Sequence, residues 1–175
     1  MTPKHVPDVT FHTRQRIKLP DGGTSFEWKH LSTEDVFGGK RVVLFAVPGA
    51  FTPACSDEHL PGYENLHDDF LAEGIDLVTC LSVNDAFVMN QWAKSRNIEK
   101  VMMLPDGNGA FTRELGLLVD RTAVGMGFRS WRYAMLVENR EITAFLPEPG
   151  FVEVPKAVPY GASSAENMLD HIRSM

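Results

Sequence analysis

The sequence predicts an α/β domain in which buried strands alternate with helices along the chain. Three apolar runs have the length of buried strands and end at turn or cap residues, at 41–47, 75–83 and 101–104. Segments with a helical spacing of apolar residues lie between them, at 63–71 and 85–93. The length of 175 residues corresponds to one domain, 1–175, that is large enough to bury a core.

The composition excludes several kinds of partner. The chain has a net charge of -6, whereas nucleic-acid binding would need a basic face. Segment 1–15 has no apolar leader, and no apolar run approaches the ~20 residues of a membrane span. We therefore expect a cytoplasmic protein that binds neither nucleic acid nor membranes.

Cysteine and histidine usage argues against a disulfide framework and against a metal site. The two cysteines, Cys55 and Cys80, form no C-x-x-C motif, which fits a reducing compartment. The six histidines are scattered, with no paired short spacing. We expect no bound metal and no cofactor.

The N-terminal part predicts a β-hairpin beside the main sheet. Apolar residues alternate with polar ones on both sides of a Pro-Asp-Gly-Gly turn at 20–23. A short helix is then expected to start at 32–35, and Gly38-Gly39 returns the chain to the strand at 41–47.

The turn after this strand places a cysteine at the start of a helix. Thr52 suits the N-cap and Pro53 the first helical position, which puts Cys55 third, among backbone N–H groups without intrahelical partners. These donors and the positive end of the helix dipole favour a thiolate over a thiol. The alternative is a small buried residue, as most free cysteines are. The local pattern favours a reactive thiol.

The middle of the chain continues the alternation. The helix that carries Cys55 should be kinked or interrupted at Pro61-Gly62 and then run on to Leu71. Asn84-Asp85 caps the helix after the second strand, and a further helix is expected over 109–115.

The C-terminal part predicts an antiparallel hairpin, an irregular loop and a last helix. Strands at 131–137 and 142–146 flank a turn at 138–140, and a proline-rich loop covers 147–160. Ser163 and Glu166 have the spacing of a capping box at the last helix. The order of elements is that of a thioredoxin-like fold with extensions.

Three blocks of sequence carry a resemblance to a known family. Pro48, Thr52 and Cys55 form a P-x-x-x-T-x-x-C pattern inside the string PGAFTPACSDEHLPGY, and CLSVNDAF at 80–87 and RSWRYA at 129–134 agree with it. The chain resembles the peroxiredoxins, most closely the type II, or peroxiredoxin 5, subfamily. The resemblance implies a thioredoxin-like fold with an N-terminal β-hairpin and peroxiredoxin-type insertions. It also implies a thiol-dependent peroxidase that reduces hydrogen peroxide and alkyl hydroperoxides.

The resemblance assigns roles to five residues. Cys55 is the peroxidatic cysteine, with Thr52 and Arg129 as further catalytic residues. Pro48, Gly49, Thr52 and Arg129 form the substrate site. On the sequence alone, Arg129 is a solvated or salt-bridged strand arginine, and only the resemblance makes it catalytic. Arg132 is expected to orient its neighbours or to pair with a carboxylate.

Two other functions are consistent with the local pattern. His59 lies four residues after Cys55, a spacing that would suit a cysteine hydrolase, although a structural histidine is the more frequent case. A redox sensor or thioredoxin-like binding module without turnover is the second alternative.

Three aromatic residues are expected in the core, in the pocket wall or at the contact of a homodimer: Phe51, Phe128 and Trp131.

The reactivity of Cys80 determines how Cys55 is regenerated after oxidation. It lies in a predicted buried strand, which makes an inert core thiol the default. Some members of the subfamily carry a resolving cysteine late in the chain, where this sequence has none. This difference favours one-cysteine cycling, with glutathione and glutaredoxin, or thioredoxin, as the external reductant.

Overall fold

The computed structural model describes residues 3–151 and 155–175. Its centre is a five-stranded sheet with the order β5-β4-β3-β8-β9. The strands are β3 (Arg41–Ala46), β4 (Leu77–Ser82), β5 (Met102–Pro105), β8 (Tyr133–Glu138) and β9 (Glu141–Pro147). Strands β3, β4 and β5 are parallel, and β8 and β9 run antiparallel to their neighbours. The sheet confirms the α/β, thioredoxin-like fold that the sequence predicts.

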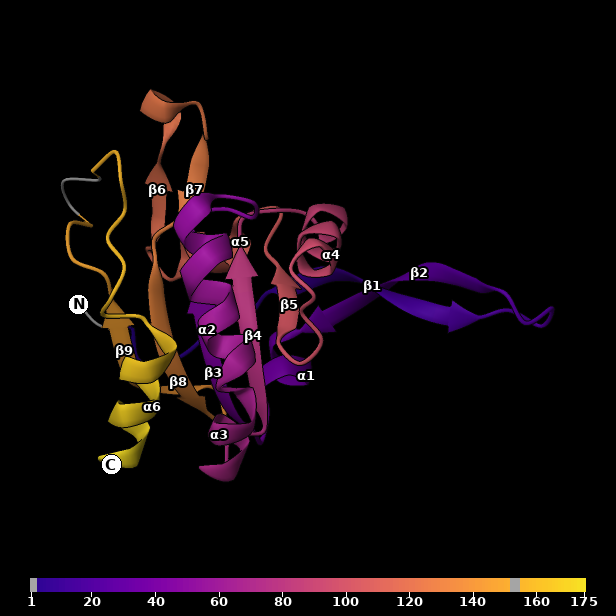
Figure 1. The fold of residues 1–175 in the computed structure, drawn as a ribbon, viewed down its shortest axis with the longest axis horizontal. Coiled ribbons are helices and arrows are strands. Elements are labelled where there is room, and N and C mark those ends of the chain that lie inside the picture. The colour runs from indigo at the N-terminus through magenta and orange to yellow at the C-terminus, as the bar shows by residue number, and fades with distance from the viewer. Residues whose placement is uncertain (1–2, 152–154) are drawn as a thin grey trace.

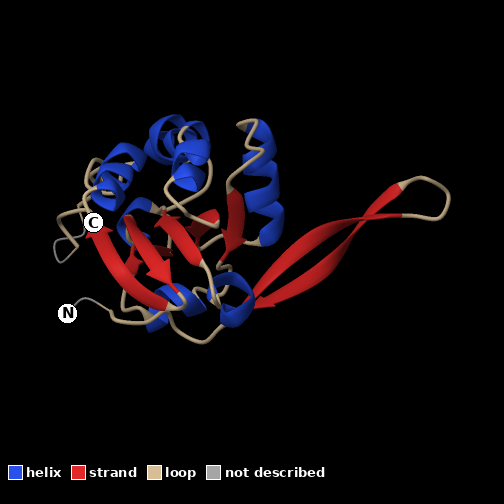
Figure 2. Ribbon diagram, turned by 90° about the horizontal axis from the view of Figure 1, so that it is seen from below, coloured by secondary structure: helices blue, strands red, loops and turns tan. Residues whose placement is uncertain are grey.

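Helices cover both faces of this sheet (Figures 1 and 2). Helices α2 (Leu60–Asn65), α3 (His67–Ala72), α4 (Ala86–Ser95) and α6 (Ala165–Arg173) lie on one face, and the short α1 (Thr33–Phe37) and α5 (Ala110–Glu114) lie on the other. Alternate residues of β3 point to the two layers, Val43 and Phe45 to one and Val42 and Leu44 to the other. A strand buried on both faces reads as a continuous apolar run, which is why it could be predicted.

The N-terminal hairpin forms a separate two-stranded sheet, β1 (Thr10–Lys18) and β2 (Thr24–Ser32). It projects from the body of the molecule (Figure 2), and Trp28 and Arg14 in its middle pack against Phe87 of α4, while its base packs against the core. At this base Phe11 is buried, with its ring 5.4 Å from that of Phe111. The predicted hairpin is therefore correct, and it joins the body through side-chain packing rather than by pairing with the main sheet.

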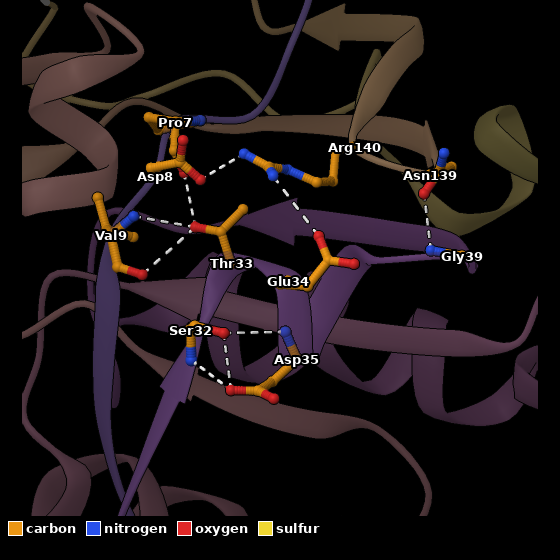
Figure 3. Close-up of polar contacts among 10 residues, drawn as sticks. All are labelled: Pro7, Asp8, Val9, Ser32, Thr33, Glu34, Asp35, Gly39, Asn139 and Arg140. Carbon is orange, nitrogen blue, oxygen red and sulfur yellow. Dashed lines mark hydrogen bonds and ion pairs between the residues drawn. The ribbon is translucent and has the colours of Figure 1, made fainter.

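Polar contacts around α1 bind the N-terminal segment to the β8–β9 turn (Figure 3). Ser32 caps α1 and exchanges hydrogen bonds with Asp35, as the predicted helix start requires. The Thr33 hydroxyl donates to the carbonyl of Pro7 at 2.7 Å, and Arg140 forms ion pairs with Asp8 and Glu34.

Two short strands after α5 were not predicted as a pair. Strands β6 (Leu118–Asp120) and β7 (Phe128–Ser130) form a second two-stranded sheet, joined through a 3-10 turn, η2 (Thr122–Val124). Their register places Arg129 opposite Val119. Trp131, predicted as the first residue of the next strand, lies in the connection between β7 and β8.

The capping box predicted for the last helix is shifted by one residue. Ser164, rather than Ser163, is the N-cap of α6, and its side chain accepts a hydrogen bond from the backbone of Asn167. Ser163 instead donates through its N–H and its hydroxyl to the buried carboxylate of Glu148. A buried carboxylate needs donors, and this requirement decides which serine caps the helix. Of the predicted loop 147–160, residues 152–154 lie outside the described residues.

None of the helices that the structure describes combines the length and the apolar character needed to cross a membrane.

Candidate active site

The turn after β3 is held in place by its neighbours in the sheet. Val47 continues the pairing of the strand by donating to Leu81, and Ala50 donates its N–H to the amide oxygen of Asn84 at 3.0 Å. The hydroxyl of Ser82 donates to the same oxygen at 2.7 Å. Asn84 was predicted to cap α4 together with Asp85. Asp85 is the cap, and Asn84 fixes the turn instead.

Cys55 follows this turn in an irregular helical segment. Helical structure begins at Pro53, as predicted, and Ser56 donates to the Thr52 carbonyl at 3.0 Å. From Cys55 to His59 the chain forms a π-helix, η1, in which the N–H of Leu60 donates to the carbonyl of Cys55. The sulfur-bearing residue is fully buried.

The π-helix explains how the chain accommodates Pro61. The sequence predicted a kink at Pro61-Gly62, but Pro61 lies inside α2 and the irregularity comes before it. A proline has no N–H to donate and its ring clashes with the carbonyl four residues earlier in a regular α-helix. A turn with bonds between residues five apart removes this conflict, and such turns are frequent at functional sites. The helix breaks later, at Leu66, between α2 and α3.

The side chain of Thr52 is oriented by the preceding turn. Its hydroxyl donates to the Gly49 carbonyl at 2.7 Å. A hydroxyl that donates still has two acceptor lone pairs, so Thr52 can accept a hydrogen bond from a thiol or a peroxide. Thr52 therefore precedes the helix at the predicted position, but its hydrogen bond points back to the turn rather than forward to the helix.

Gly49, Thr52 and Arg129 converge although Arg129 comes from the distant strand β7. A Cβ atom at Gly49 would lie 3.2 Å from Nη1 of Arg129, and 3.3 Å from both Cγ2 of Thr52 and Cε of Met126. Arg129 donates through Nε to the Met126 carbonyl at 2.9 Å. No carboxylate pairs with Arg129 in the part of the chain that the structure describes. The salt-bridged role that the sequence alone allowed is therefore absent there.

Met126 is a contact that the sequence did not indicate. Its carbonyl holds the guanidinium of Arg129 and its side chain lies next to Gly49, which keeps this side of the site apolar. It lies in an irregular connection between two three-residue strands, where no periodicity marks a residue as inward-facing.

His59 is directed to the C-terminal part of the chain rather than to a catalytic cysteine. Nδ1 accepts a hydrogen bond from Nη1 of Arg132 at 3.1 Å, because a guanidinium can only donate. Nε2 therefore carries the proton and donates to the Ser163 carbonyl at 3.0 Å. With both ring nitrogens engaged, His59 has no free nitrogen with which to act as the base of a cysteine hydrolase. Arg132 therefore orients His59, the first of its two expected roles, and its guanidinium lies 5.7 Å from the centroid of the Tyr160 ring.

This buried histidine makes stability depend on pH. Burial, and then the charge of Arg132, lower the pKa of His59 well below its ordinary value, so folding favours the neutral ring. The contribution of neutral His59 to the free energy of unfolding is complete above the ordinary histidine pKa of 6.5. It is lost progressively as the pH falls below that value, because the unfolded chain then binds a proton that the folded chain does not. Between pH 7 and pH 5 we expect the free energy of unfolding to fall by up to about 2 kcal/mol through this group. Urea titrations of the native chain and of His59→Gln at both pH values measure it, and an equal pH dependence in both proteins would contradict it.

Cys80 lies in the core of the sheet. It is fully buried in β4 between Phe45 of β3 and Met103 of β5. Burial raises the pKa of the Cys80 thiol well above its ordinary value, and proximity to Cys55 adds to the rise. Both cysteines are free thiols in the structure. A protonated, buried thiol is a poor nucleophile.

The three aromatic residues considered from the sequence differ in their positions. Trp131 belongs to the core and donates through its indole to the Glu148 carbonyl at 2.8 Å. Phe51 and Phe128 are exposed over 53% and 59% of their surface. Phe51 also has a positive φ of 64°, a backbone conformation that is rare for an aromatic residue.

Comparisons with known proteins agree with this geometry. A family model described as Redoxin matches residues 4–157. Peroxiredoxin sll1621 of Synechocystis is 49% identical over 173 residues, which are 99% of this chain and 92% of the relative. Among solved structures, reduced Prx3 of Vibrio vulnificus in complex with H2O2 is 40% identical, with a TM-score of 0.82 over 99% of this chain and 97% of the other. The antioxidant protein of Plasmodium falciparum, a 1-Cys peroxiredoxin, is 30% identical, with a TM-score of 0.89 over 98% of both chains.

Proposed function

Because the chain belongs to the redoxin family as a peroxiredoxin, with type II and peroxiredoxin 5 proteins among its relatives, we propose that it is a thiol-dependent peroxidase that works through Cys55 alone. The observation that carries the proposal is the contrast between its two cysteines. Both are fully buried, but Cys55 lies in the irregular helical turn that follows Thr52, and the preceding turn residue Gly49 lies against Arg129, whereas Cys80 lies in strand β4 of the sheet.

In the first half-reaction the thiolate of Cys55 attacks one oxygen of the peroxide. A sulfur–oxygen bond forms, the oxygen–oxygen bond breaks, and the departing oxygen takes a proton to leave as water or an alcohol. The cysteine becomes a sulfenic acid. Negative charge develops on the departing oxygen, so donors aimed at that oxygen accelerate the step.

The surrounding residues would supply these interactions. The planar guanidinium of Arg129 can hold the thiolate and the peroxide together, since among the described residues only its Nε has a hydrogen-bond partner. Thr52 can accept a hydrogen bond from the peroxide while its own hydroxyl donates to the Gly49 carbonyl. A side chain at Gly49 would force Arg129, Met126 or Thr52 to shift by a few tenths of an ångström, and Pro48 would limit the access of water.

The second half-reaction requires an external thiol. A thiol condenses with the sulfenic acid to form a mixed disulfide and water, and a second thiol releases Cys55 by exchange. Glutathione with glutaredoxin, or thioredoxin, has the chemistry to supply both thiols. The 1-Cys peroxiredoxin among the structural relatives supports the one-cysteine cycle for this chain.

We also propose that the protein forms a homodimer in the cytoplasm. The exposed rings of Phe51 and Phe128 support a dimer contact near the site, because large apolar side chains in water favour burial at an interface. A reducing compartment would keep the free thiols available.

The mass of the intact protein after one equivalent of hydrogen peroxide tests the one-cysteine cycle. We expect the addition of one oxygen at Cys55 without glutathione, and a glutathione adduct at the same residue with it. A loss of two hydrogens would instead indicate a Cys55–Cys80 disulfide.

Cys80→Ala is the matched variant, and we expect it to keep the native turnover within about 2-fold, since a buried, protonated thiol takes no part in the reaction. A large loss in this variant, with an unchanged rate of Cys55 oxidation, would contradict the one-cysteine cycle. Oxidation that neither glutathione nor thioredoxin reverses would indicate a sensor without turnover.

A further inference from the structure

A pair of histidines lies across the β1–β2 hairpin. The antiparallel register places His12 of β1 directly opposite His30 of β2, and both side chains are exposed. Their Nδ1 atoms are 2.9 Å apart, and their ring planes meet at 79°. The expectation of no metal site rested on spacing along the sequence, and the hairpin brings together two residues that are 18 positions apart.

The two Nδ1 atoms share a hydrogen bond in this structure, so one ring donates its proton to the other, and a metal ion would take the place of that proton. A neutral imidazole binds a first-row divalent metal at about 2.0–2.1 Å, so two such bonds at a right angle span about 2.9 Å. Two bonds at the tetrahedral angle would span about 3.3 Å. The observed separation fits two adjacent corners of a square-planar or octahedral site, which is the geometry of copper(II) and nickel(II).

Trp28 packs against one ring of the pair and joins the hairpin to the body of the molecule. Trp28 lies parallel to the ring of His30, with 6.3 Å between the centroids and 12° between the planes. Trp28 also packs edge-on against Phe87 of α4, which fixes the hairpin to the body at this point. Asp85 lines the same cavity as His12 and Trp28, but its carboxylate accepts a hydrogen bond from the backbone of Val88 as the cap of α4.

We propose that His12 and His30 bind one copper(II) ion through their Nδ1 atoms, and nickel(II) less tightly. No group of three His, Cys, Asp or Glu side chains suited to a metal occurs in residues 3–151 and 155–175, so water completes the coordination. Such a site joins the two strands of the hairpin and leaves the peroxide chemistry at Cys55 unchanged. Copper(II) is preferred because it forms the strongest complexes among these divalent ions.

Nickel(II) chloride titrated calorimetrically into the reduced native chain tests the site without oxidising the thiols. We expect one ion per chain, and at least about 10-fold weaker binding in His12→Ala and in His30→Ala, because each variant loses one of two protein ligands. His5→Ala is the control, since His5 is also exposed but has no histidine opposite it. Equal affinity in the native chain and in both hairpin variants would overturn the proposal.

Electron paramagnetic resonance of copper(II) provides a readout that a folding defect cannot imitate. The Cys55→Ser chain removes the reactive thiol, and its copper(II) spectrum should show coupling to two equivalent imidazole nitrogens. His30→Gln in the same chain should show one, with an unchanged circular dichroism spectrum. A spectrum with one nitrogen or none before the second substitution would overturn the proposal.

Discussion

Replacement of Cys55 by serine is expected to abolish peroxide turnover, with a loss of at least about 1,000-fold in kcat/KM, because a serine hydroxyl is not ionised at neutral pH. The change removes one polarisable atom and keeps the shape of the π-helix. The decrease in kcat/KM for hydrogen peroxide, measured with an excess of thiol, reports it directly. Stopped-flow fluorescence of the reduced protein should show no rapid oxidation phase.

Cys80→Ala is the matched control for this experiment. Both cysteines are fully buried, so loss of activity through general destabilisation would affect both variants. Alanine is preferred to serine at position 80, because a hydroxyl between Phe45 and Met103 would have no polar partner on the adjacent strands. Peroxide reduction at a native rate by Cys55→Ser would refute the assignment of the peroxidatic residue.

Replacement of Arg129 by alanine is expected to lower kcat/KM for hydrogen peroxide by about 100- to 1,000-fold, the effect of removing one donor from a developing oxyanion. Among the described residues the guanidinium donates one hydrogen bond, from Nε to the Met126 carbonyl, and no carboxylate neutralises it. Its loss therefore removes positive charge from the site. Rapid mixing of reduced protein with peroxide isolates this step from the later reaction with thiols.

Two further variants separate the role of the arginine in chemistry from a role in folding. Arg129→Lys keeps the charge but loses the planar arrangement of donors, so we expect only partial recovery of the rate. Arg113→Ala removes an exposed arginine of α5 whose guanidinium bonds to the Asn108 carbonyl at 3.4 Å, and it should react as the native protein does. Equal rates for Arg129→Ala and the native chain would exclude Arg129 from the peroxide site.

The main sheet and its helices could be predicted because burial determines their sequence pattern. Strand β3 is covered on both faces, so its residues are apolar without interruption, and the glycine and proline residues that follow mark its end. The position of Cys55 near the start of a helix followed from the same local rules. The three-residue strands β6 and β7 were missed, since so short a segment shows no periodicity.

The details that sequence reasoning could not supply depend on contacts between distant segments. Whether the turn at Cys55 is an α-helix or a π-helix depends on how the chain accommodates Pro61. Which serine caps α6 depends on Glu148, and whether His59 faces Cys55 depends on Arg132. The position of Arg129 beside Gly49 came from resemblance to a family, because a single arginine on a short strand carries no signal of its own.

The complete burial of Cys55 means that the two halves of the catalytic cycle need different shapes of the same turn. A peroxide of a few atoms can reach an enclosed sulfur, but a folded reductant the size of thioredoxin cannot. The sulfenic acid must therefore move outward before any protein thiol meets it, and the bonds between residues five apart in Cys55–His59 are the ones that must open. Repair by a folded reductant is then possible only while this turn is open.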